Sequence, residues 1–185
     1  MVMPHSVHRG GTTIGSPRPP EPPAAAPRWR SEWLPAALQR RLRDYVRGGG
    51  EVAAFADETL RRTVTLKDGR LEAPSPLRVT DAFGARLEQR ARRRVDLTVY
   101  TNGEGVFDTV NGLFRDWRTW EATRSPGPGE LVAAAGPEPD RPVIVGITLG
   151  EGLVIRAGLP GWAKRLDTDP SVSSFTEQAW ELLSR

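Results

Sequence analysis

Residues 31–185 predict a single α/β domain, and three stretches carry that prediction. Residues 34–47 place apolar side chains at helical spacing and end at three glycines. The short apolar run 52–56 that follows has the composition of a strand buried on both faces. Residues 142–157 predict a β-hairpin around Gly-Glu-Gly, and residues 171–183 predict a closing amphipathic helix. A helix that leads directly into a buried strand is the repeating unit of α/β folds.

The first predicted helix rests on one apolar stripe. Its members are Leu34, Leu38, Leu42, Tyr45 and Val46. Pro35 is tolerated because it falls in the first turn, and Gly48 ends the helix. The closing helix has a similar inner stripe made of Phe175, Ala179, Trp180 and Leu183.

The middle of the chain predicts mainly strands and turns. Strands are expected at residues 63–66, 70–72, 95–100, 119–123 and 131–135. The first two flank an Asp-Gly turn and form a hairpin. Thr80 predicts the cap of a helix over residues 81–92. Residues 106–117 fit helical spacing but contain the turn signal Asn111-Gly112, so both interpretations stay open.

The N-terminal stretch differs in composition from the rest. Residues 1–30 contain seven of the 17 prolines and almost no large apolar residue, which predicts a disordered Pro/Arg-rich tail. Four Arg and one Glu there account for the whole net charge of +3, and residues 31–185 are neutral. Nucleic acid is therefore not expected as a partner, and the basic run 90–94 is interpreted as a solvated helix end.

Several chemistries are excluded by residue type. The chain has no cysteine, and its only histidines, His5 and His8, lie in the predicted tail. The folded part therefore has no cysteine nucleophile, no Ser-His-Asp triad and no histidine zinc site. We expect no catalytic residues, no metal site and no cofactor. No apolar run is long enough for a membrane span or a secretory signal, which predicts a cytoplasmic chain, and 24 arginines against two lysines indicate a bacterial source.

Two loops are candidate ligand-binding sites. Asp57 and Glu58 follow the predicted strand 52–56, and ligands of open α/β sheets bind beyond the carboxyl ends of the strands. Asn102 and Glu104 follow the predicted strand 95–100 and could lie on the same rim. The alternative for the first pair is that Asp57 caps a short helix, and the alternative for the second is a simple turn.

The six tryptophans allow two interpretations. If exposed, Trp117 and Trp120 beside their neighbouring arginines would form a platform that stacks on sugar rings or bases. If buried, they belong to the core.

Three parts of the sequence resemble one known family. They are the stretch Tyr45-Val46-Arg47-Gly48-Gly49-Gly50-Glu51-Val52, the Gly-Glu-Gly hairpin, and the terminal Leu-Pro-Gly-Trp at 159–162 with the helix that follows it. The chain resembles the later half of class I glutamine amidotransferase-like domains. This flavodoxin-like family includes ThuA-like proteins and β-galactosidase trimerisation domains. Within it, the likeness is greatest to the C-terminal domain of N,N-dimethylformamidase beta-subunit-like proteins.

The resemblance implies a truncated flavodoxin-like sheet with helices on its faces, a closing β-hairpin and a C-terminal helix. Such domains begin with one or two β-α units that this chain lacks, which implies an open edge at strand 51–56 and a protein partner or homodimer there. The absence of cysteine excludes amidotransferase activity. We therefore expect a non-catalytic accessory domain that packs on a larger catalytic or assembly partner. The alternatives are a metal-dependent amidohydrolase related to N,N-dimethylformamidase and a carbohydrate-binding module.

Overall fold

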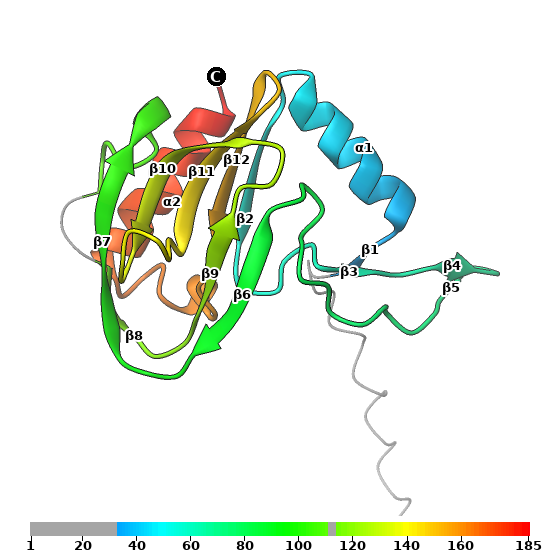
Figure 1. Cartoon of the computed structure of the whole chain (residues 1–185), viewed down its shortest axis with the longest axis horizontal. Coiled ribbons are helices and arrows are strands. Elements are labelled where there is room, and N and C mark those ends of the chain that lie inside the picture. Colours follow the sequence, from blue (N-terminus) through cyan, green and yellow to red (C-terminus); the bar gives the residue numbers. More distant parts are fainter. Residues whose placement is uncertain (1–32, 111–113) are drawn as a thin grey trace, which may run out of the picture.

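The computed structural model describes residues 33–110 and 114–185 (Figure 1). In this part of the chain the elements are, in order, β1 (Trp33–Leu34), α1 (Ala36–Arg47), β2 (Glu51–Phe55), β3 (Arg62–Thr63), β4 (Leu66–Lys67), β5 (Arg70–Leu71), β6 (Arg86–Ala91), β7 (Val95–Asn102), the 3-10 turn η1 (Gly103–Gly105), β8 (Phe114–Trp117), β9 (Trp120–Ser125), β10 (Glu130–Gly136), β11 (Ile144–Leu149), β12 (Gly152–Ala157), η2 (Trp162–Lys164) and α2 (Pro170–Leu183). The expectations for the tail 1–30, with its two histidines, fall outside the described residues.

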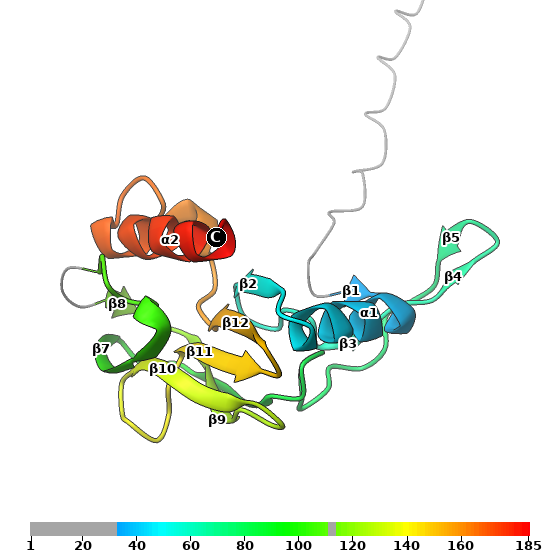
Figure 2. The same ribbon diagram turned by 90° about the horizontal axis from the view of Figure 1, so that it is seen from above.

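A mixed six-stranded sheet forms the centre of the fold. Its strand order is β2-β12-β11-β10-β7-β8. The β2–β12 pair is parallel, and the other pairs in this sheet are antiparallel. Helix α1 lies on one face of the sheet and α2 on the other (Figure 2). The predicted α/β class is confirmed, but a flavodoxin-like sheet is not, because the strands of such a sheet run parallel.

The helices predicted over residues 34–47 and 171–183 form as α1 and α2, but their buried faces differ from the predicted stripes. In α1 the buried residues are Gln39 and Val46, and Leu38 and Tyr45 are 46% and 58% exposed. Gln39 faces inward because its amide donates a hydrogen bond of 2.7 Å to the carbonyl of Arg62. In α2 Phe175 and Ala179 are buried as predicted, whereas Trp180 is 71% exposed. A periodic stripe locates a helix, but the neighbouring strands decide which side of it is covered.

The strand predictions are confirmed where a glycine-containing turn joins two strands into a hairpin. The hairpin β11–β12 and the small hairpin β4–β5 around Asp68-Gly69 form as expected. Strand β2 is an edge strand and is only half-buried, so the expectation of burial on both faces was wrong. In the ambiguous stretch 106–117, residues 114–117 are strand β8, and the turn signal Asn111-Gly112 lies outside the described residues.

The helix predicted over residues 81–92 is absent, and strand β6 takes its place. The carboxylate of Asp81 accepts hydrogen bonds from the backbone N–H groups of Phe83, Gly84 and Ala85, which fixes a turn instead of a first helical turn. Strand β6 then pairs antiparallel with β9. The run 90–94 therefore lies at a strand end. Arg93 pairs with Glu138 and Arg94 with Asp116 there, which corrects the interpretation as a helix terminus.

Each face of the sheet has its own apolar core. The core under α2 is rich in aromatic rings, which contact one another at centroid distances of 5.3 to 6.4 Å. These rings belong to Phe55, Phe107, Phe114, Trp117, Trp162 and Phe175. The core under α1 is mainly aliphatic, with Phe83 as its aromatic member, and it joins Val46 to Val145, Ile147, Leu149 and Val154.

Among the described residues, no helix has the length and apolar character needed to cross a lipid bilayer. The cytoplasmic location and the division into a tail and one domain stay predictions.

Replacing Phe175 by Ala is expected to lower the free energy of unfolding by about 3–5 kcal/mol, because its ring contacts four other aromatic rings in the core under α2. Trp180→Ala on the same helix is the matched control, with an expected change within about 0.5 kcal/mol because Trp180 is exposed. Urea unfolding followed by circular dichroism measures both. Equal effects of the two substitutions would contradict the core described above.

Candidate functional site

The most unusual chemical feature of the fold is a buried cluster of charges between the sheets. Arg156 on β12 and Arg61 both pair with the carboxylate of Glu121 on β9, one with each oxygen. Nη1 of Arg156 also lies 3.8 Å from Oδ2 of Asp81. All four side chains are between 1% and 4% exposed. Two cations and two anions make this ion network neutral, which is how buried charges are normally tolerated.

Backbone carbonyls accept further hydrogen bonds from the two arginines, whereas Nε of Arg156 is buried without a partner. Nε of Arg61 donates to the carbonyl of Arg78 at 2.6 Å, and Nη1 of Arg156 donates to the carbonyl of Thr59 at 3.4 Å. Burial raises the pKa of Asp81, and the Coulombic attraction of Arg156 and the three backbone N–H donors act in the opposite direction. The network thereby fixes the loops around residues 59, 78 and 81 to the main sheet.

The loop that leaves β2 is strained and is held by this network. Ala56, Glu58 and Leu60 all have positive φ, at 118°, 58° and 60°. Such conformations cost about 1–3 kcal/mol each for residues other than glycine. The backbone N–H of Glu58 donates to Oε1 of Glu121 at 3.3 Å, and the hydroxyl of Thr59 donates to the carbonyl of Ala56 at 2.9 Å. The strained loop therefore depends on Glu121.

The candidates Asp57 and Glu58 lie in this loop, at the carboxyl end of β2 as predicted. The short helix that Asp57 was expected to cap is absent, and the residues form turns instead. A capping role at a helix is therefore wrong for Asp57. Ligand binding by either residue stays a prediction.

The candidates Asn102 and Glu104 lie far from the first pair. Strand β7 is antiparallel to β10 and runs opposite to β2, so its carboxyl end lies at the other end of the sheet. Three strands also separate β7 from β2. Asn102 is engaged locally, because its amide donates to Asp108 at 2.8 Å and its oxygen accepts from the N–H of Phe107 at 2.7 Å. The expectation of one shared rim was wrong.

Neither metal chemistry nor a tryptophan platform is built into the described residues. Residues 33–110 and 114–185 contain no group of three or more His, Asp or Glu side chains that could hold a metal ion. Trp117, Trp120 and Trp162 are buried, which confirms the core interpretation for them. The guanidinium of Arg165 stacks over the ring of Trp117 at 4.0 Å and covers that ring from outside.

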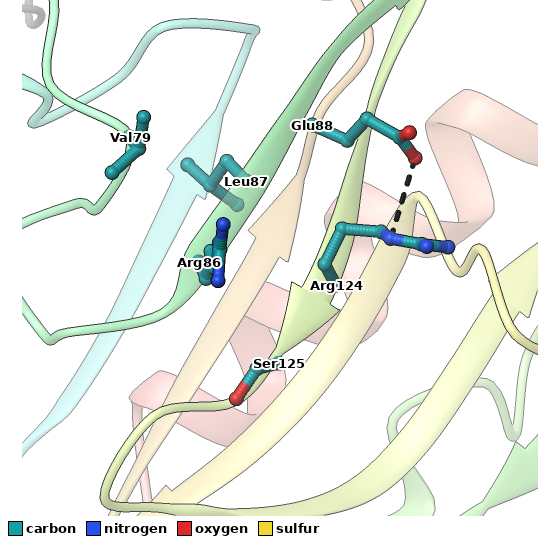
Figure 3. A pocket seen from close by; sticks show the side chains of 6 residues that line it. All are labelled: Val79, Arg86, Leu87, Glu88, Arg124 and Ser125. Atoms are coloured by element: carbon teal, nitrogen blue, oxygen red, sulfur yellow. Dashed lines mark ion pairs between the residues drawn. The ribbon is translucent and has the colours of Figure 1, made fainter.

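A separate open pocket of about 510 Å³ lies along the β6–β9 ladder (Figure 3). It is lined by Val79, Arg86, Leu87, Glu88, Arg124 and Ser125. Nε of Arg124 pairs with Oε2 of Glu88 at 3.5 Å, and Arg86 adds a second cation to the wall. The lining holds no histidine, and its one carboxylate, Glu88, is the partner of Arg124.

Sequence reasoning missed the ion network, although a signal was present. Arg156 interrupts the apolar strand Leu153-Val154-Ile155-Arg156-Ala157, and Glu121 stands between Trp120 and Ala122. A charge inside an apolar strand must find a buried partner or disrupt the strand, because an unpaired buried charge costs several kcal/mol. The two positions therefore predict each other as partners.

No protein-family model matches the chain. The β-galactosidase Bga of Halorubrum lacusprofundi is 31% identical over 149 residues, which is 77% of this chain and 21% of that protein. A solved β-galactosidase from Bacillus circulans covers 82% of the chain with 10% identity and a TM-score of 0.51, and one from Rahnella sp. R3 covers 83% with 12% identity and a TM-score of 0.49.

The likeness is to β-galactosidases. The resemblance to glutamine amidotransferase-like and N,N-dimethylformamidase-like domains was therefore wrong. It rested on glycine-bounded apolar strands, which many α/β proteins share. The chain spans about a fifth of the length of the proteins it matches. At 10% identity, the Bacillus circulans structure supports the fold and nothing more.

Replacing Glu121 by Ala is expected to lower the free energy of unfolding by about 3–5 kcal/mol, because it leaves two buried guanidinium groups without their carboxylate. Glu138→Ala removes an exposed carboxylate that pairs with Arg93 and should cost only about 0–1 kcal/mol. Urea unfolding measures both. A Glu121→Ala variant as stable as Glu138→Ala would contradict the role assigned to the network.

The raised pKa of Asp81 gives its stability contribution a defined pH dependence. The folded protein holds this proton more firmly than the unfolded chain does, so the contribution falls as pH rises from the unfolded pKa through the folded one. Asp81→Asn carries no titrating proton, and its stability relative to the native chain should therefore improve over that range. Urea unfolding from about pH 4 to about pH 8 tests this. A stability difference that is constant with pH would contradict it.

Proposed function

We propose that this chain is a non-catalytic accessory domain that packs on a larger β-galactosidase-like polypeptide. The observation that supports this most directly is the match of 149 residues, 31% identical, to only 21% of the Halorubrum β-galactosidase. A segment that makes up a fifth of an enzyme, and that folds around its own two cores, fits an accessory unit of that enzyme.

The state of the buried carboxylates supports a non-catalytic role. Glycoside hydrolysis needs two carboxyl groups that flank the sugar, one able to donate a proton and one to act as nucleophile or base. Glu121 is held by two guanidinium groups, and Asp81 is held by three backbone N–H groups and Arg156. The candidate acids Glu58 and Glu104 lie at opposite ends of the sheet, so they cannot flank one substrate.

The observations that motivated the two alternative functions do not hold in the structure and the comparisons. The amidohydrolase rested on the N,N-dimethylformamidase resemblance, which the comparisons overturn. The carbohydrate-binding module needed several exposed rings. Trp180 is the most exposed tryptophan in the described part of the chain, and α2 has no second exposed large apolar residue beside it.

A chimera tests the proposal. The 149 matched residues of the Halorubrum β-galactosidase are replaced by the matching part of this chain, and a variant with the segment simply deleted is the control. We expect the chimera to hydrolyse a β-galactoside and the deletion variant to fail, because the segment serves as a structural unit. The purified chain alone should show no hydrolysis. Activity of the chain alone, or a chimera no better than the deletion, would overturn the proposal.

A further inference from the structure

The open pocket along the β6–β9 ladder shares no residue with the ion network and has the size of a small-molecule site. Its volume of about 510 Å³ falls within the range of about 300–1,000 Å³ that such sites occupy. Side chains from three neighbouring backbone segments line it (Figure 3). Arg86 bridges to Thr80 on one side of β6 and pairs with Ser125 on the other, so backbone pairing holds all three segments in place.

A β-bulge brings two adjacent residues of β9 into this pocket. Arg86 pairs with Ser125 and Leu87 pairs with Thr123, so Arg124 has no partner on β6. Neighbouring residues of a regular strand point to opposite faces, yet Arg124 and Ser125 both line the pocket. Bulges redirect side chains in this way and are frequent beside functional sites. The irregularity therefore adds a second guanidinium to the wall that Arg86 already lines.

Two side chains of the lining have hydrogen-bond donors to spare. The exposed guanidinium of Arg86 forms no hydrogen bond or ion pair within residues 33–110 and 114–185. The hydroxyl oxygen of Ser125 accepts from the N–H of Gly127 at 3.2 Å, which leaves the hydroxyl proton for another acceptor. Residues directly opposite each other on antiparallel strands present their side chains on the same face. Arg86 and Ser125 therefore offer their donors together.

Arg124 is held only by long contacts with exposed acids. Its Nε lies 3.5 Å from Oε2 of Glu88, and its Nη1 lies 3.8 Å from Oδ2 of Asp140. Charge-assisted hydrogen bonds are shorter, at about 2.7–2.9 Å. Exposed ion pairs of this length are weak, so a ligand can share the donors of this guanidinium and the acceptors of Glu88.

The charge of the lining selects the kind of anion. Two arginines and one glutamate give it a net charge of +1. A carboxylate, with one negative charge, balances this lining. A phosphate group carries about −1.5 to −2 at pH 7 and is repelled by Glu88. Residues 1–30 contain four Arg and one Glu, so the charge of that stretch does not complement the pocket.

We propose that this pocket binds a small carboxylate that also carries hydroxyl groups, which is the chemistry of a sugar acid. Arg86 and the Ser125 hydroxyl donate to the ligand carboxylate. Arg124 donates to the ligand hydroxyl groups and Glu88 accepts from them, while Val79 supplies apolar contact to the carbon skeleton. The proposal concerns a ligand of this chain itself and does not rest on the accessory role.

Three small molecules test the assigned ligand class. D-galacturonate carries a carboxylate and hydroxyl groups, D-galactose has the same ring without the carboxylate, and inorganic phosphate is an anion without a ring. Each is titrated into the full 185-residue chain, and backbone amide signals are followed by NMR. Galacturonate should shift the amide signals of Arg86 and Ser125 with a dissociation constant in the millimolar range or lower. Galactose and phosphate should bind at least about tenfold more weakly.

Three arginine variants locate the contact. Arg86→Gln removes the unpaired cation and keeps a side chain that donates hydrogen bonds, and it should weaken galacturonate binding about tenfold or more. Arg124→Gln should weaken it as well and provides a second test if Arg86→Gln fails to fold. Arg115→Gln is the matched control, because Arg115 is exposed on β8 in the main sheet, and it should leave binding unchanged. Circular dichroism verifies the fold of each variant.

Several results would overturn the proposal. They are the absence of galacturonate binding, and galacturonate binding that Arg86→Gln and Arg124→Gln leave intact. Equal binding of galactose would make this a pocket for neutral sugars, and equal binding of phosphate would make it a simple anion site. Galacturonate binding that appears only after residues 1–32 are removed would assign the pocket to the chain's own N-terminal segment.

Discussion

The carboxylate of Glu121 is the contact on which the rest of the structure depends. It sits on β9, in the small β6–β9 ladder, and binds one guanidinium from the main sheet and one from the loop after β2. It thereby joins two sheets and offsets the strain of three positive-φ residues. Charges at this depth are stable only as a complete set, because each one desolvates the others and removal of one leaves its partners unpaired.

The same network engages the buried carboxylates of Glu121 and Asp81. Its carboxylates are saturated by guanidinium and N–H donors, and they are inaccessible to a substrate. The two candidate loops, which follow β2 and β7, lie at opposite ends of the sheet because β7 runs opposite to β2.

The sequence also determined which reactions this chain cannot perform. The absence of cysteine removes thiol nucleophiles, and the absence of histidine outside the first eight residues removes Ser-His-Asp triads and histidine metal sites from the rest of the chain. It did not determine the family, because helix–glycine–strand units are shared by many α/β proteins. The likeness to β-galactosidases rests on 31% identity over 149 residues and not on a short motif.

Local physics determined the elements whose signal lies within one turn or one hairpin: α1 with its glycine stop, α2, the β11–β12 hairpin and the Asp-Gly turn. Tertiary structure decided the rest. Residues 86–91 are a strand because β9 offers them a ladder and Asp81 fixes the preceding turn. Leu38 stays exposed because α1 packs on the sheet through Val46 and Leu42, and the buried Arg156 and Glu121 are tolerated because each lies beside the other. Pairing partners and strand directions are long-range properties, and no local periodicity contains them.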